Sequence, residues 1–232
     1  MNKYFDAFKK DLSFFFPKKT PVLHAELKEY KFSNEFVDLF PITADLLMRG
    51  TKTKIMFAGR VMILFSWEKG DEICSWICEF NRPKIDLIKE HEILINNMGG
   101  IVYTSKGPES IELNGIDYNY TLTMNQDFMY TGSKCTENLD WEQYYREKCE
   151  RYNAAPIDLS NIVIFIREAS GSECFCYKHN KEVIMFSHDH SFKFVKLIED
   201  QPDLTMYKIL GVKTFQDYVE LASLQWREYL TL

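Results

Sequence analysis

Long apolar runs are missing from this sequence. A run as long as any, Val61–Phe65, suits a single strand, whereas a helix that crosses a membrane needs about 20 apolar residues. Charged side chains also interrupt the first residues, MNKYFDAFKKDLSFFFPKK, every few positions, so this segment does not have the apolar centre of a secretory signal. We therefore expect no membrane partner and a cytoplasmic location.

Glycine and proline are scarce, with 10 Gly and 7 Pro in 232 residues. Linkers are usually rich in these residues, so the composition favours one compact unit. Hydrophobic residues make up 46% of the chain and aromatic residues 15%, which excludes a disordered chain. The 6 cysteines are expected to stay reduced, because disulfides are rare in cytosolic proteins.

Clusters of positive charge are also missing. Lysine occurs in short, scattered runs such as Lys9-Lys10 and Lys18-Lys19, and the formal net charge is −6. Nucleic-acid binding depends on clustered Lys and Arg that displace counterions from phosphates, so we expect no nucleic-acid partner. An acidic chain instead suits a basic protein partner, because opposite potentials raise the rate of encounter.

The apolar periodicity predicts helices near the start, in the middle and at the end of the chain. The clearest lies within Arg82–Gly100, where Pro83 suits the first turn and Gly99-Gly100 suits the stop. Thr214 and Asp217 have the capping-box spacing that begins the last helix. Other helices are predicted over residues 2–16, after Ser33, from Thr43 to Met48, and over Asp140–Tyr152.

Segments rich in apolar and β-branched residues predict strands between these helices. Lys54–Trp67 reads as two strands with a turn at Gly59, and Asn114-Gly115 is typical of a hairpin turn. Further strands are predicted over Glu72–Phe80, Ile101–Thr104, Ile162–Ile166 and Phe192–Ile198, with a hairpin over Cys174–Phe186. This order predicts an α+β fold whose mixed, largely antiparallel sheet is packed by N-terminal, middle and C-terminal helices.

Recognisable catalytic motifs are absent. His91-Glu92 could begin the H-E-x-x-H pattern of zinc proteases, but position 95 is isoleucine, so the second histidine ligand is missing. The chain has no G-x-S-x-G nucleophile motif. Gly99-Gly100 follows a helix, whereas a phosphate site needs glycines before one. We therefore expect no enzyme activity and no cofactor.

The triplet His188-Asp189-His190 is the most chemically suggestive run. On a strand its two histidines share a face, and Cys174 and Cys176 lie nearby in the predicted hairpin. One hypothesis is a metal-dependent hydrolase that uses the triplet with one of these thiols as zinc ligands. We favour core thiols and no bound metal, because free cysteine is among the most buried residue types.

Three segments resemble the SUKH superfamily. RPKIDLIKEHEILINNMGGIVY, at 82–103, is similar to its first helix and glycine stop. NIVIFIREASGSECFCYKHNKEVIMFSHDH, at 161–190, is similar to its central strands, and KTFQDYVELA, at 213–222, to its closing helix. Met98 departs from the usual Asn-Gly-Gly stop, and the segment Asp140–Tyr152 has no clear counterpart.

The resemblance implies a division of the chain and a function. Residues 81–232 would form a SUKH-like α+β domain, and residues 1–80 an N-terminal extension packed on it. Bacterial members of the superfamily are largely immunity proteins that bind and block a cognate toxin, often a nuclease. The resemblance therefore implies a non-enzymatic protein-binding domain.

The residues expected to bind that partner lie at one end of the sheet. They are Glu173, His188, Asp189 and His190, because the polar triplet falls where the hairpin strand should emerge from the core.

Overall fold

A computed structural model describes residues 2–16, 21–80, 87–108, 126–133, 139–168, 171–188, 192 and 194–232. Within this part the helices are α1 (Lys3–Asp11), α2 (Asn34–Leu39), α3 (Pro41–Arg49), α4 (Lys89–Met98), α5 (Leu139–Arg151) and α6 (Phe215–Leu230). The strands are β1 (Val22–Glu26), β2 (Thr51–Phe57), β3 (Arg60–Lys69), β4 (Glu72–Glu79), β5 (Gly100–Ser105), β6 (Gln126–Ser133), β7 (Ile162–Glu168), β8 (Glu173–Tyr177), β9 (Val183–Phe186), β10 (Val195–Leu197) and β11 (Met206–Ile209).

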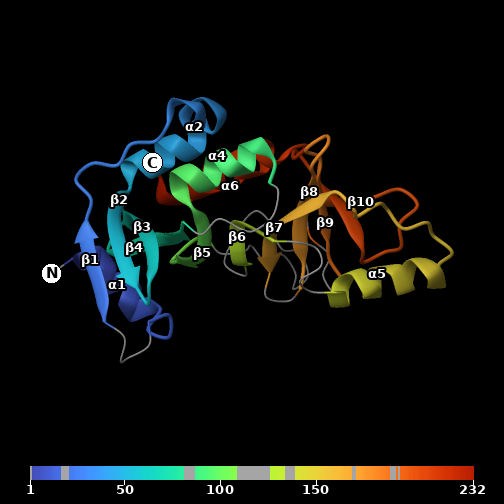
Figure 1. Ribbon diagram of the computed structural model, residues 1–232, viewed down its shortest axis with the longest axis horizontal. Helices are drawn as coiled ribbons and strands as arrows, with labels where there is room; N and C mark the ends of the chain where they lie inside the picture. The colour runs from blue at the N-terminus through green and yellow to red at the C-terminus, as the bar shows by residue number, and fades with distance from the viewer. Residues whose placement is uncertain are drawn as a thin grey trace.

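The described strands form one antiparallel sheet in the order β1-β2-β3-β4-β5-β6-β7-β8-β9-β11-β10 (Figure 1). Neighbours in sequence are mostly neighbours in space, and β11 lies between β9 and β10. β5 pairs with β6, with Ile101 opposite Met129. This junction joins β1–β5 to β6–β11. The arrangement confirms the predicted α+β class with its largely antiparallel sheet.

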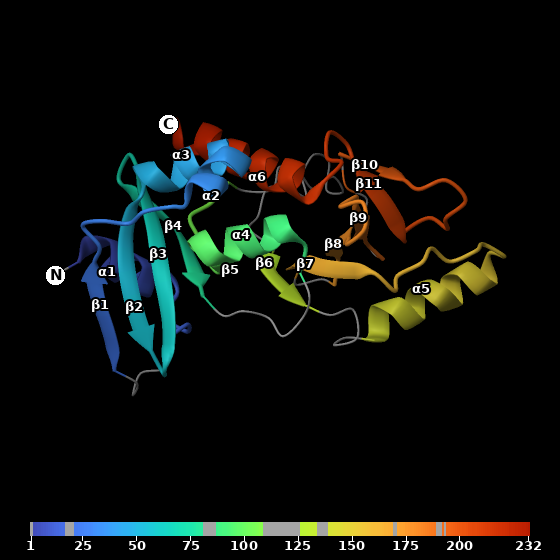
Figure 2. The same ribbon diagram turned by 45° about the horizontal axis from the view of Figure 1, so that its top comes forward.

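The two faces of the sheet carry different helices (Figure 2). On β3, Ile63 and Phe65 pack into the core shared with α2, α3, α4 and α6, whereas Met62 and Leu64 pack with α1. Alternate residues of a strand point to opposite faces, so α1 covers the second face. At the other end of the sheet, α5 covers that same second face over β7–β9.

Short polar side chains determine where several helices begin. Asn2 Oδ1 accepts hydrogen bonds from the backbone N–H groups of the first turn of α1. Ser33 caps α2, and its Oγ accepts from Phe36 N at 3.2 Å. Thr214 and Asp217 form the expected capping box at α6. Each cap satisfies N–H groups that have no partner within the helix.

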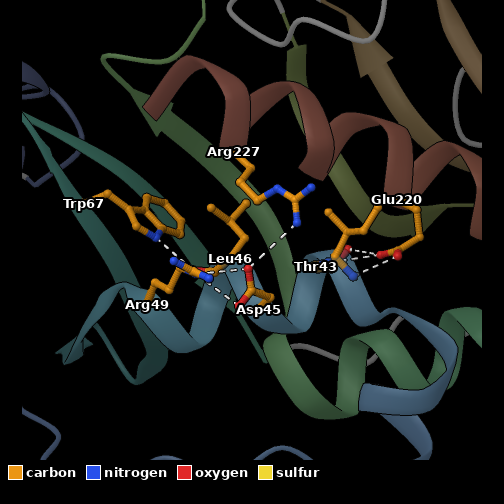
Figure 3. Close-up of polar contacts among 8 residues, drawn as sticks. Thr43, Asp45, Leu46, Arg49, Trp67, Glu220 and Arg227 are labelled. Atoms are coloured by element: carbon orange, nitrogen blue, oxygen red, sulfur yellow. Dashed lines mark hydrogen bonds and ion pairs between the residues drawn. The ribbon is translucent and has the colours of Figure 1, made fainter. Parts of the chain in front are cut away.

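Helix α3 has a cap supplied from α6 (Figure 3). Its own N-cap, Phe40, provides no side-chain hydrogen bond. Glu220 accepts from Ile42 N at 2.9 Å, from Thr43 N at 3.0 Å and from Thr43 Oγ1 at 2.8 Å. Thr43, predicted to cap this helix, therefore lies inside it. A carboxylate at this position also interacts favourably with the helix dipole, so it ties α3 to α6.

Further along α3, another contact attaches it to the sheet. Trp67 Nε1, on β3, donates to Leu46 O at 2.9 Å (Figure 3). The Trp67 ring lies 5.3 Å from Trp76, which in turn lies 5.2 Å from Trp226 of α6. Large aromatic rings bury much apolar area, so this cluster joins α3, the sheet and α6 in one core.

Some boundaries differ from the sequence prediction. Helix α1 ends at Asp11 and not near residue 16, because the chain turns and places the Phe16 ring 5.6 Å from Phe5. Helix α4 begins at Lys89, since Ile88 is extended, and the predicted start at Pro83 lies outside the described residues. Strand β11 was not predicted. The Asn114-Gly115 turn lies outside the described residues. No helix in the described part is long and apolar enough to cross a membrane.

Candidate functional site

Glu173 and His188, two of the predicted partner-binding residues, lie at one end of β8 and β9, on the α5 side of the sheet. Glu173 begins β8 and is directly opposite Phe186, which ends β9. Directly opposed residues share a face, and Phe186 packs with α5. The His188 ring stacks on Phe186, so it lies on this face too. Asp189 and His190 are outside the described residues.

Glu173 is buried in an ion pair. Its exposed fraction is 2%, and Arg167 Nε, on β7, donates to its Oε1 at 2.8 Å. Burial raises the pKa of the Glu173 carboxyl, and the Arg167 charge opposes that rise. The carboxylate thus links β8 to β7 through the ion pair and does not contribute to the accessible surface.

The same ion pair is only partly satisfied. Glu173 Oε2, Arg167 Nη2 and the neighbouring Ser172 Oγ are buried without a hydrogen-bond partner among the described residues. The desolvation cost of such a pair largely offsets its attraction. Removal of one partner would nevertheless leave an uncompensated buried charge, which is strongly destabilising. The pair therefore makes this end of the hairpin sensitive to substitution.

His188, Phe186 and Tyr144 form an aromatic stack that reaches the surface. The His188 ring is 6.0 Å from Phe186 at an interplanar angle of 11°, and 5.8 Å from Tyr144 of α5 at 71°. Beneath them, Trp141 lies 4.9 Å from Phe186. A Cβ on Gly171 would be 3.2 Å from His188 Cε1. Tyr144 is 38% exposed, so the stack has a fixed position and an accessible edge.

Those of the alternative zinc ligands that the structure describes do not share one face of the sheet. Cys174 and Cys176 pack in the core beneath α6, whereas Phe186 and the stacked His188 face α5. Burial raises the pKa of the Cys176 thiol to about 12, and zinc binds the thiolate form. Among the described residues, no three His, Cys, Asp or Glu side chains are placed to hold a metal ion.

Other groups with catalytic potential are core residues. Burial raises the pKa of Cys74 to about 11 and that of Cys78 well above its usual value. His91 of α4 is fully buried, and its Nε2 donates to Tyr130 O at 2.7 Å. Burial lowers the pKa of His91 to about 4, so the ring is neutral and its N–H is already engaged.

A hollow on the outer side of α5 is a feature that sequence reasoning did not single out. A hollow of about 600 Å³ lies between this helix and the segment 154–156 that follows it. Trp141, Tyr145 and Cys149 form the buried side of the helix, as the helical period predicts. Glutamates occupy several of the remaining positions, and no local sequence signal distinguishes them from ordinary solvent-facing charges.

No protein-family model, curated protein or solved structure matches this chain. The SUKH resemblance accordingly remains a prediction from three sequence segments.

Proposed function

We propose that this protein is a non-enzymatic protein-binding domain of the cytoplasm, an immunity protein that binds and neutralises a cognate toxin. Nucleases are the first toxin class to test. The supporting observation is the exposed stack of Tyr144 and His188 on Phe186. Aromatic anchors dominate the energetics of protein interfaces. Because the sheet and Gly171 hold these rings in position, little side-chain entropy remains to be lost on binding.

The order of elements is compatible with the SUKH resemblance. Helix α4 ends at Gly99, the β8–β9 hairpin follows in the second half, and the capped α6 closes the chain. The net charge of −6 suits a basic toxin, because charge complementarity raises association rates and specificity.

The test is co-expression with any toxin that is encoded beside the gene for this protein. The wild type should restore growth and bind the purified toxin in calorimetry. Tyr144→Ala should raise the dissociation constant about 30-fold, which is the typical effect of losing an interface anchor. Tyr152→Ala is the matched control, because Tyr152 is 63% exposed just beyond the end of α5 and does not belong to the stack.

Two results would count against the proposal. Equal losses in the Tyr144 and Tyr152 variants would remove the stack as the binding site. Turnover of a substrate by purified protein that binds no toxin would replace the binding function with a catalytic one.

A further inference from the structure

We infer that the hollow beside α5 takes a basic segment of the partner, a stretch containing lysine or arginine. This inference rests on the proposed function and adds a second contact site to it. Helix α5 falls in the segment Asp140–Tyr152, which has no counterpart in the SUKH resemblance. The hollow would therefore give this chain a contact of its own.

The floor of the hollow is apolar and firmly held. It includes Cys149 on the helix and Ala154 and Pro156 on the segment that folds back along it. Ala154 N donates to Cys149 O at 2.9 Å. Ile157 N donates to Tyr145 Oη at 2.7 Å. Because these bonds fix the wall beforehand, an occupant does not have to order it, and such preorganisation favours binding.

The rim of the hollow carries carboxylates that are not matched by cations. Glu142 accepts from Arg146 Nη2 at 2.6 Å, so these two charges offset each other. Glu147 receives a hydrogen bond from Gln143 Nε2 at 2.8 Å, and this neutral donor leaves its charge uncompensated. In the part of the chain described here, neither Glu147 nor Glu150 forms an ion pair with a basic side chain.

In the described part of the chain, the remaining cations of α5 do not pair with the rim glutamates. At about 100° per residue, Lys148 falls on the opposite flank from Glu150, whereas Arg151 lies one turn beyond Glu147 without forming an ion pair with it. Lys148 Nζ lies 3.3 Å from Tyr144 Oη on that flank. The hollow also lies toward the C-terminal half of the helix, where the dipole favours positive charge.

A lysine or arginine side chain matches both properties of the hollow. Its methylene stem would cover the apolar floor while its charged end reached the glutamates, as long basic side chains do on other surfaces. An acidic or purely apolar segment would leave the rim carboxylates repelled or desolvated. The basic segment is therefore the occupant whose chemistry fits.

The experiment titrates the full-length protein with the peptide acetyl-Arg-Lys-Arg-Lys-amide and follows backbone amide shifts by NMR. The shifts should concentrate on α5 and residues 154–156, and binding should weaken as salt is added. The double variant E147Q/E150Q should bind about tenfold more weakly, as expected for the loss of two partly screened charge contacts. The control E29Q/E228Q makes the same change in net charge at two exposed glutamates elsewhere.

Equal weakening in both double variants would overturn the inference, because it would show only a general charge effect. Shifts centred away from α5 would overturn it too. If E147Q/E150Q binds the toxin as tightly as the wild type does, the hollow is not a contact site, while the immunity function stands. If the wild type binds no toxin, the immunity function fails, and the peptide shifts still report whether the hollow accepts basic side chains.

Discussion

Acid should destabilise this protein through one histidine. His91 is fully buried on α4, and its pKa falls from 6.5 to about 4 because burial disfavours the charged ring. Its Nε2–H is bonded to Tyr130 O at 2.7 Å, and within the described part of the chain its Nδ1 has no hydrogen-bond partner. A second proton would therefore place a charge in the core beside the Phe215 ring, 4.7 Å away.

The sign and size of the effect follow from the two pKa values. Below pH 6.5 the unfolded chain binds a proton at His91 and the folded chain does not, so acid favours unfolding. The stabilising contribution is complete above pH 6.5 and is lost as the pH falls toward 4. With about 1.4 kcal/mol for each unit of pKa shift, the full loss is about 3 kcal/mol.

The matched variant is His91→Gln, whose side-chain amide can still donate toward Tyr130 O and does not titrate. Urea denaturation of both proteins at pH 7.5, 6.5, 5.5 and 4.5 gives the free energy of unfolding at each pH. The wild type should lose about 2–3 kcal/mol more than the variant over this interval, since the full loss is reached only below pH 4. Glu173, whose raised pKa acts in the opposite direction, is common to both proteins and cancels. Parallel pH profiles would refute the reasoning.

Three further predictions concern the free energy of unfolding at pH 7, measured by urea denaturation. Glu173→Ala should cost about 1–3 kcal/mol, because it leaves the partly buried Arg167 guanidinium, whose side chain is 21% exposed, without its carboxylate partner; an unchanged midpoint would contradict this. Glu220→Ala should cost about 1–2 kcal/mol through the lost cap of α3. Glu228→Ala, at an exposed position of the same helix, should stay within about 0.5 kcal/mol, and equal effects would exclude the capping role. Gly99→Ala should cost about 2–3 kcal/mol, since φ is +79° and the new Cβ would lie 2.7 Å from a backbone oxygen. Gly70→Ala, at φ +59° in open space, should cost less, and the reverse order would show that the close approach is not limiting.

Much of the local structure could be predicted because its signals lie within a few residues. Ser33 and Thr214 cap their helices as their spacing suggested, and Gly99 ends α4 in the conformation that favours glycine. The β8–β9 hairpin was predicted from the alternation of its residues and the polar turn between its strands. Strand β11 was missed, because Met206–Ile209 is short and is stabilised mainly by its neighbours β9 and β10.

The candidate site was only partly predictable. The sequence placed Glu173 and His188 at the same end of the sheet, and the structure agrees. Sequence could not indicate that Glu173 is buried against Arg167, because that contact depends on how β7 and β8 pair beneath α5. Nor could it indicate that Tyr144, from a distant helix, completes the aromatic stack.

By itself, the sequence determined the α+β fold class, through the periods of the helices and strands and the residues that cap the helices. It also showed that no recognisable catalytic motif is present. Only the tertiary structure decided that Cys174 and His188 face opposite sides of the sheet and that Glu220 caps a helix that begins at Pro41. The physical reason is the distance along the chain over which each interaction acts. Periodicity and capping act over one or two turns, whereas burial, ion pairing and shared faces arise when segments far apart in the chain pack together.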